Sequence, residues 1–342
     1  PLVDASFPMR VAGALRVFWR GLVQVVLPVQ LSGDYSFPQE PVPARLQEHE
    51  NVLGAAAMLL LPIASILLWI RCLRRERKVR RALFANFPSG LDAGALRVSM
   101  PHLRMLAAVG LMWVVVAYFP HSNIPVLLPT VRAERFWYFP VVGSSLAIAA
   151  CMAWMVERAR TRWTSAVAVG LCTTFLTFQA ARARIHAFDY NDDLTFWDAT
   201  RKAVPNSAKA HLNYSVMWGA RGRLDVRLHA NQRALQLAPT WPMAHIYLGD
   251  TLCRLHRTDE AWPHYKKGFE LVPGDPNLIA LALQCLWDEN ALQEHRDELV
   301  ALADAHSGSW LAYLARDTLD NGDKHSGVDP QYRPRGYNEG PK

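Results

Sequence analysis

The sequence feature that most constrains the fold is residues 52–70, a run of 19 amino acids without a charged side chain. About 20 apolar residues in a helix span the hydrocarbon core of a bilayer, so this run predicts a membrane helix. The run ends at residues 71–81, where seven of eleven residues are Lys or Arg. Because cationic loops are retained in the cytoplasm, the basic segment predicts a cytoplasmic end for this helix.

Four more apolar segments extend the prediction to a polytopic bundle over residues 1–182. The expected membrane helices lie near residues 11–31, 52–70, 103–119, 137–156 and 163–180. The first segment also contains Arg16 and Arg20, and it could lie in the interface instead of crossing the bilayer. Counted alternately from the basic segment, the loops around Asp34 and His121 and everything after Ala180 share the outer face.

Charge is divided between the two halves of the chain. Residues 1–182 carry 19 Lys and Arg against 9 Asp and Glu, whereas residues 183–342 carry 18 against 21. The basic pI of about 9.3 therefore reports the membrane half and mainly its basic loop. Nucleic-acid binding needs a basic face on a folded module, so this distribution argues against a nucleic-acid partner.

Residues 183–320 show an internal repeat. Pro205, Pro239 and Pro273 are each separated by 34 residues, the period of tetratricopeptide (TPR) helix pairs. The signature positions of the unit before Pro273 are filled by Leu248, Gly249, Leu252, Ala261, Tyr265 and Gly268. After Pro273 the pattern decays, as in a capping unit. The sequence thus predicts an all-α chain, a membrane helix bundle followed by a TPR α-solenoid, with a disordered tail at 321–342.

No catalytic or metal-binding sequence motif is found. The five cysteines show no paired spacing, so we interpret them as small apolar residues without a disulfide framework or zinc site: Cys72, Cys151, Cys172, Cys253 and Cys285. His245 and His256 could share a helix face, but no acidic or cysteine partner clusters with them, and no metal is predicted. Asp192 or Asp193 is expected to cap the helix that follows.

The polar loop between the third and fourth membrane segments is the candidate site. It contains His121, Arg132, Glu134 and Arg135 at the mouth of the predicted membrane domain. Ionisable groups beside hydrocarbon are costly unless they are paired or hydrated, so they mark a functional site. The alternative interpretation is an interfacial anchor, in which aromatic residues and arginines lie at the level of the headgroups.

Three stretches resemble one family of membrane proteins. They are Leu31-Ser32-Gly33-Asp34-Tyr35-Ser36, Pro120-His121-Ser122-Asn123, and Ala133-Glu134-Arg135-Phe136-Trp137-Tyr138-Phe139-Pro140. Together with the order of a polytopic half and then repeats, they resemble the transmembrane and TPR repeat-containing O-mannosyltransferase-like proteins, which are GT-C type glycosyltransferases. Val141 departs from that family, which often has serine there. The family's first membrane helices and its first outer loop have no counterpart in the chain.

The resemblance implies the C-terminal portion of an enzyme that moves a sugar from a polyprenyl-phosphate carrier to a protein hydroxyl. Its catalytic acids are expected upstream of this chain, which should be inactive alone. No cofactor is expected in this chain, and the resemblance implies a lipid-linked sugar donor. Arginine suits a phosphate because it donates two parallel hydrogen bonds and stays charged. The expected phosphate- and substrate-binding residues are Arg135 and Arg132, with Glu134 orienting an arginine or the acceptor and with Asp34 and His121 lining the cavity.

The resemblance also implies partners, whereas the expected location follows from the charges of the loops and from the lack of paired cysteine spacing and of clustered Asn-X-Ser/Thr motifs. Membrane lipid and a protein acceptor, or another partner held by the TPR repeats, are the expected partners. The expected location is a bacterial inner membrane, with residues 71–81 cytoplasmic and the TPR domain periplasmic. The alternative is a membrane-anchored TPR adaptor, which organises protein–protein interactions without catalysis.

Overall fold

The computed structural model describes residues 5–86, 102–128 and 131–321, and the described residues are helical without strands. The chain divides into two compact units. The first, called the membrane unit here, contains residues up to Ser36 and Glu40–Asn191. The second, the soluble unit, contains Phe37–Gln39 and the residues from Asp192 onward. The main boundary between the two units therefore follows Asn191. The sequence alone predicted a boundary after residue 182.

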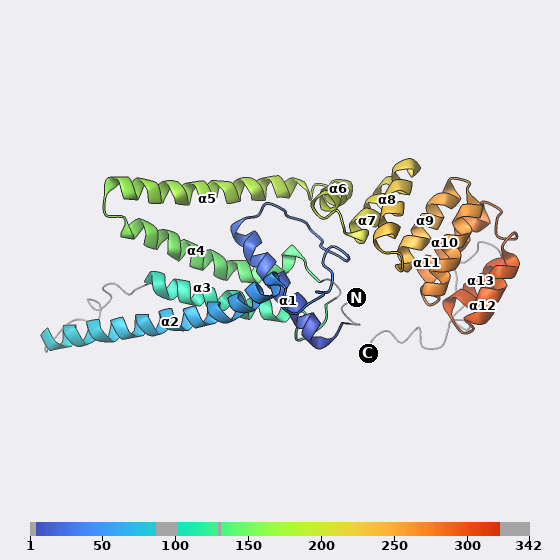
Figure 1. The fold of residues 1–342 in the computed structure, drawn as a ribbon. Coiled ribbons are helices and arrows are strands. Elements are labelled where there is room, and N and C mark those ends of the chain that lie inside the picture. Colours follow the sequence, from blue (N-terminus) through green and yellow to red (C-terminus); the bar gives the residue numbers. More distant parts are fainter. Residues whose placement is uncertain (1–4, 87–101, 129–130, 322–342) are drawn as a thin grey trace. The chain divides into compact units, whose positions relative to one another are not determined.

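Among the described residues of the membrane unit, four helices are long and apolar enough to cross a membrane. The unit contains the helices α1 (Phe7–Val26), α2 (His49–Asn86), α3 (His102–Tyr118), α4 (Tyr138–Arg158) and α5 (Arg162–Phe188). The four candidate spans fall on α2 to α5, which confirms four of the five predicted segments. The first predicted segment, residues 11–31, corresponds to α1, which is not among these candidate spans. In Figure 1 it runs at a steep angle to the long helices while it packs against α2.

Glycines allow close contacts between helices of the membrane unit. A Cβ on Gly54 of α2 would lie 1.9 Å from the Leu15 carbonyl oxygen of α1. A Cβ on Gly110 of α3 would lie 2.5 Å from the carbonyl oxygen of Gly143 on α4, and the reverse distance is also 2.5 Å. Small residues are common at such interfaces because helix association in lipid depends on close packing.

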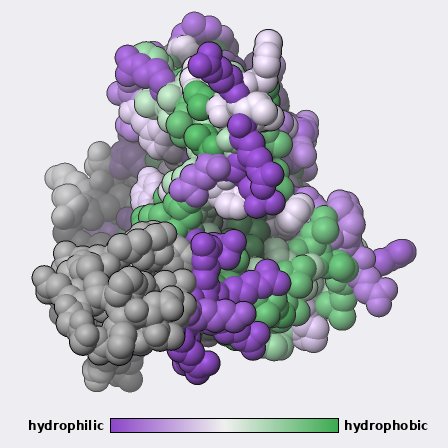
Figure 2. Space-filling view, turned by 90° about the vertical axis from the view of Figure 1, so that its left-hand side faces the viewer, coloured by the Kyte–Doolittle hydropathy of each residue, from purple (hydrophilic) through white to green (hydrophobic). Residues whose placement is uncertain are grey.

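The basic segments lie at one end of this bundle, and the polar loops lie at the other (Figure 1). α2 ends in its arginine-rich turns where α4 turns into α5, and hydrophilic side chains gather there beside apolar surface (Figure 2). The segments 27–36, 40–48, 119–128 and 131–137 lie at the opposite end, joined by hydrogen bonds. The prediction that these two loops share one face is confirmed, whereas the side of the membrane that they face stays a prediction.

The soluble unit is a series of helix hairpins. It contains α6 (Asp193–Ala203), α7 (Ala208–Gly219), α8 (Leu224–Leu237), α9 (Pro242–Arg254), α10 (Thr258–Leu271), α11 (Pro276–Asp288), α12 (Arg296–Ala305) and α13 (Trp310–Asn321). α7, α9 and α11 begin at residues 208, 242 and 276, so the 34-residue period of the prolines is also the period of the helices. The assignment of these hairpins to the TPR class stays a prediction.

The signature positions predicted from the repeat lie in the core of the soluble unit. Leu248, Leu252, Ala261 and Tyr265 are all at most 4% exposed. A Cβ on Gly249 would lie 2.8 Å from the ring of Tyr265, so glycine there admits the aromatic side chain of the paired helix. The apolar core continues through α11, α12 and α13, and the capping role predicted for this region stays a prediction.

Two local predictions have different outcomes. Asp192 caps α6, because its carboxylate accepts a hydrogen bond of 2.9 Å from the Thr195 amide. The prediction that no cysteines pair was wrong, since Cys253 of α9 and Cys285 of α11 form a disulfide. The two cysteines are 32 residues apart and are brought together by the packing of successive hairpins. The predicted tail at 321–342 lies outside the described residues, apart from Asn321 at the end of α13.

Candidate functional site

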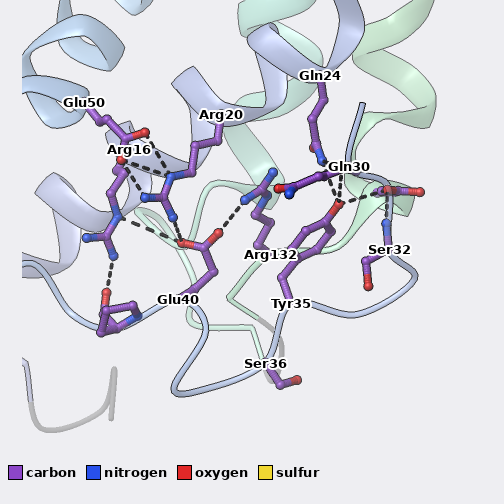
Figure 3. A network of polar contacts seen from close by, with 12 residues as sticks. Arg16, Arg20, Gln24, Gln30, Ser32, Tyr35, Ser36, Glu40, Glu50 and Arg132 are labelled. Carbon is purple, nitrogen blue, oxygen red and sulfur yellow. Dashed lines mark hydrogen bonds and ion pairs between the residues drawn. The ribbon is translucent and has the colours of Figure 1, made fainter. Parts of the chain in front are cut away.

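Glu40 is the centre of a buried ion-pair network at the polar end of the membrane unit (Figure 3). Its side chain is 1% exposed, and Oε1 accepts a hydrogen bond of 2.5 Å from Nη1 of Arg132. Oε2 accepts a hydrogen bond of 2.6 Å from Nη1 of Arg20, and the Nε of Arg16 lies 4.0 Å away. One carboxylate from the first loop therefore joins α1 to the loop before α4.

The arginines of α1 have further partners that balance their charge. Nε and Nη2 of Arg20 donate to Glu50 at the start of α2, with Nη2 2.6 Å from Oε2. Arg16 donates to Glu48 over 3.5 Å and to the carbonyl oxygen of Pro41. Buried charges are tolerated only when they are paired and hydrogen-bonded, and the three arginines here face three glutamates.

Tyr35 connects this network to a second one (Figure 3). The guanidinium of Arg132 lies 4.1 Å from the centre of the Tyr35 ring, a cation–π contact. The Tyr35 hydroxyl donates to Oε1 of Glu134 over 3.0 Å and accepts from Gln24 of α1 over 2.6 Å. Burial and the negative charge of Glu134 raise the pKa of Tyr35, so the phenol stays neutral and acts as a donor.

Glu134 is the centre of the second network. Its Oε1 accepts a hydrogen bond of 2.6 Å from the Ser32 amide, and its Oε2 lies 2.9 Å from Nε2 of His186 on α5. The other ring nitrogen of His186 lies 2.8 Å from Oδ2 of Asp189. The histidine is therefore held between two carboxylates, an arrangement that can move a proton between them.

α5 reaches this site because it continues beyond the predicted end at residue 180. Gln179 donates to the carbonyl oxygens of Val25 and Val26 over 3.1 and 3.0 Å. Arg182 donates to the carbonyl oxygens of Pro28 and Val29 over 2.8 and 2.6 Å. These bonds satisfy carbonyl groups at the end of α1, which otherwise lack partners within the helix.

The structure distributes the predicted site residues over different environments. Arg132 and Glu134 lie in the two connected networks, and the backbone carbonyl of Asp34 accepts from the Ser32 hydroxyl over 3.0 Å. Asp34 itself is 5% exposed, and its carboxylate accepts from the Ser36 amide over 2.8 Å, so it shapes the loop.

Arg135 and His121 lie around Phe136. Arg135 is exposed and its guanidinium lies 5.4 Å from the Phe136 ring centre. The ring of His121 stacks on Phe136 at 5.6 Å, and its Nδ1 has no hydrogen-bond partner in the part of the chain that the structure describes. These two predicted residues are thus brought to one aromatic ring.

Two predicted site residues are held by other parts of the membrane unit, and their roles toward a ligand stay predictions. The side chain of Arg132 is 10% exposed, and its guanidinium is bound to Glu40. The hydrogen-bonding partners of Glu134 are Ser32, Tyr35 and His186, so the interactions found there orient the loops and α5. Both side chains position the loops around the site.

Several residues of the site were not predicted from the sequence. They are Arg16, Arg20, Gln24, Tyr35, Glu40, Glu50, His186 and Asp189. A signal was present in α1, because Arg16, Arg20 and Gln24 are spaced four residues apart and so share one helix face. Polar side chains in a row on an otherwise apolar helix indicate a buried polar partner.

The described residues at this end of the membrane unit include no group of His, Cys, Asp and Glu with the spacing of metal ligands. Among the described residues, the grouping with the spacing of metal ligands is Asp259, Glu294 and His295 in the soluble unit. Both acids are exposed, and the His295 ring stacks on Trp262 at 4.4 Å. Exposed acidic groups of this kind are ordinary surface features.

Comparisons with known proteins do not assign this protein to a family, so its class is described from the structure alone. No protein-family model matches the chain, and no curated protein matches it. Over the residues that it describes, the structure is all-helical, with four helices long and apolar enough to cross a membrane followed by helix hairpins of 34-residue period.

Proposed function

We propose that this protein is the donor-binding part of a membrane glycosyltransferase that uses a polyprenyl-phosphate sugar and modifies protein hydroxyl groups. The observation that carries the proposal is the pair of buried charged networks at one end of an apolar helix bundle. Such networks fix loop geometry where hydrocarbon meets water, which is where the phosphate of a lipid carrier must be held.

Within this proposal Arg135 binds the carrier phosphate. It is exposed, it follows directly after Glu134 in the sequence, and it belongs to a loop held by Glu134 and Arg132. His121, on the same aromatic ring as Arg135, lines the phosphate site. A guanidinium suits this role because its parallel N–H groups match two phosphate oxygens and its charge is permanent.

An apolar groove supports a lipid substrate. The groove lies between α2 and α3 and has a volume of about 370 Å³. Its walls include Ile66, Trp69, Met112 and Val116. An isoprenoid chain fits such a surface because the chain has no polar atom that would need a hydrogen-bond partner.

The soluble unit is proposed to bind the protein acceptor or another partner outside the cytoplasm. The disulfide between Cys253 and Cys285 supports this location, because disulfides persist in oxidising compartments and are rare in the cytosol. The seven cations of residues 71–81 support a cytoplasmic position for the opposite end of the membrane unit.

The test is binding of undecaprenyl phosphate to the full chain in lipid nanodiscs, measured by native mass spectrometry against the uncharged undecaprenol. We expect preferential binding of the phosphate, a loss of about tenfold or more in Arg135→Ala, and partial retention in Arg135→Lys. Arg158→Ala is the matched control, because Arg158 is exposed at the opposite end of α4.

Equal binding of the phosphate and the alcohol, or equal losses in the Arg135 and Arg158 variants, would reject the donor site. That result would favour the alternative, a membrane-anchored adaptor that binds protein partners through the hairpins alone. The 34-residue helix period favours partner binding in either case, because stacked hairpins expose a continuous surface.

A further inference from the structure

Two histidines of one hairpin meet in the soluble unit. His245 of α9 and His264 of α10 lie with their Nδ1 atoms 3.4 Å apart and their ring centres 5.7 Å apart. Both residues are half-buried, so each keeps contact with solvent. The sequence suggested His256 as the neighbour of His245, but the Nδ1 of His256 lies 2.5 Å from Oε2 of Glu289. The packing of α9 against α10 therefore creates an imidazole pair that sequence spacing did not indicate.

Hydrogen bonding fixes the tautomer of His245. Its Nε2 lies 2.9 Å from the carbonyl oxygen of Pro239. A carbonyl oxygen can only accept, so Nε2 carries the proton, and in the neutral ring Nδ1 keeps its lone pair. That lone pair faces His264. Metal-binding histidines have this arrangement, because the hydrogen bond from one ring nitrogen to a carbonyl orients the other nitrogen as the ligand.

The spacing of the two Nδ1 atoms suits a transition-metal ion. Zinc binds imidazole nitrogen at about 2.0–2.1 Å in tetrahedral geometry, which places two neighbouring nitrogens about 3.3–3.4 Å apart. The observed 3.4 Å matches that distance and is longer than the usual hydrogen bond from N–H, which is about 2.7–3.2 Å. The rings meet end to end, and a modest rotation of each about its Cβ–Cγ bond directs both lone pairs at one ion.

The preceding hairpin shows which part of this arrangement is structural. His211 of α7 lies 34 residues before His245, and its Nε2 makes the same contact, 3.0 Å from the carbonyl oxygen of Pro205. The position 34 residues before His264 is Ala230. The contact of histidine with a proline carbonyl thus belongs to the repeat, whereas the second imidazole is an addition in the hairpin of α9 and α10.

The charged groups beside the pair balance each other. Glu260 precedes His264 by four residues, so both lie on one face of α10. The Glu260 side chain is 58% exposed and pairs with Arg257 at 2.7 Å. The choice of ion therefore rests on the two imidazoles. Neutral imidazole suits Zn²⁺, Cu²⁺ and Ni²⁺, whereas Ca²⁺ and Mg²⁺ prefer oxygen ligands.

We propose that His245 and His264 together bind one divalent transition-metal ion, such as Zn²⁺, and that the ion crosslinks α9 to α10. Each histidine supplies its Nδ1 as a ligand, and water completes the coordination. The crosslink stabilises the hairpin in the presence of the ion, because the two ligands come together only in the folded state. The inference stands whether or not the membrane unit transfers a sugar.

Hydrogen exchange of the full chain in detergent micelles, without an affinity tag, tests this proposal. The protein is first stripped with EDTA, and exchange is then followed through titrations with ZnCl₂ and with MgCl₂. An ion that binds only the folded hairpin suppresses its opening about tenfold when the free ion is about tenfold above its dissociation constant. We therefore expect zinc to slow exchange in α9 and α10 about tenfold, and magnesium to leave it unchanged.

Three variants assign the effect to the pair. His264→Gln removes one ligand and should raise the zinc concentration for half-maximal slowing at least tenfold. His211→Gln is the matched control, because it removes the same proline contact from the hairpin with Ala at the facing position, and it should keep the zinc effect. His295→Gln disrupts the grouping of His295 with Asp259 and Glu294, and it should also keep the effect. Exchange in metal-free buffer verifies that each variant is folded.

The proposal would be overturned if zinc did not slow exchange in α9 and α10, if magnesium slowed it equally, or if His264→Gln kept the full effect. Loss of the zinc effect in His211→Gln or in His295→Gln would also reject the pair as the site. None of these results bears on binding of undecaprenyl phosphate by the membrane unit. The two proposals therefore fail separately.

Discussion

Glu40 in the membrane unit and Asp250 in the soluble unit are both carboxylates with side chains 1% exposed and held by arginines, yet their settings differ. The partners of Glu40 include Arg20 and Arg132, which are 20 and 92 residues away. Asp250 binds Arg227 and Arg254, 23 and 4 residues away. The first network joins separate loops, whereas the second lies within successive hairpins.

The cores around the two carboxylates also differ. Asp250 is next to the extended apolar core that runs from α9 to α13. Near Glu40, the buried apolar cluster of the bundle consists of Phe18, Val114 and Tyr118 with a few partly buried neighbours. In a bilayer the hydrophobic effect does not drive helices together, so packing and polar contacts carry more of the specificity. We therefore expect the polar network to matter more for local order in the membrane unit.

The largest expected effect is that of Glu40→Gln. The substitution leaves Arg132, Arg20 and Arg16 in a buried site without their shared carboxylate, which costs about 3–5 kcal/mol for a broken buried pair. Hydrogen exchange of residues 27–48 and 131–137 should accelerate by about two orders of magnitude or more, while exchange in α7 to α13 stays unchanged.

Glu48→Gln is the control for that experiment. Glu48 is 32% exposed at the side chain and contacts Arg16 at 3.5 Å, so its replacement should cost less than about 1 kcal/mol. Similar acceleration in both variants would show that Glu40 does not organise the loops, and the comparison with Asp250 would fail.

The soluble unit was largely predictable because its pattern is local and repeated. The spacing of Pro205, Pro239 and Pro273 gave the period at which α7, α9 and α11 begin, and Leu248 and Tyr265 lie in the core as expected. A repeated hairpin must bury the same positions against each neighbour, so sequence spacing reports burial directly.

The candidate site was predictable only in part. Residue type and hydropathy identified the loop of Arg132 and Glu134, but the pairing of Arg132 with Glu40 depends on how the helices bring two distant loops together. Helix packing also placed His186 beside Glu134, 52 residues away. The pairing of Cys253 with Cys285 was missed for the same reason, because the spacing of two cysteines does not specify a partner.

An intermediate effect is expected from removing the disulfide. A crosslink closing a loop of about 30 residues stabilises a domain by roughly 4 kcal/mol, mainly by restricting the unfolded chain. Replacing Cys253 and Cys285 together by alanine, or adding a reductant, should lower the free energy of unfolding of the soluble unit by about that amount. Denaturant titration with exchange read in α9 and α11 measures this.

The membrane unit supplies the internal control for the disulfide. Its Cys72, Cys151 and Cys172 are free thiols, so reductant should not change exchange in α2 to α5. If the reductant destabilised the membrane unit equally, or left the soluble unit of the unmodified chain unchanged, the crosslink would not contribute to stability as expected.

The smallest expected effect is a pH dependence in the soluble unit. Burial lowers the pKa of His264 and the charge of His245 lowers it further, with Glu260 opposing both. The unfolded chain therefore takes up the proton first, so stability is full above pH about 6.5 and declines as the pH falls through the lower pKa of the folded state.

Unfolding midpoints measured between pH 7.5 and 5 should show this decline, and His264→Gln should make it shallower. Burial also lowers the pKa of His211, so part of the slope should remain in the His264 variant. An identical slope with and without His264 would contradict the assignment, and an NMR titration of the His264 ring would then identify its true pKa.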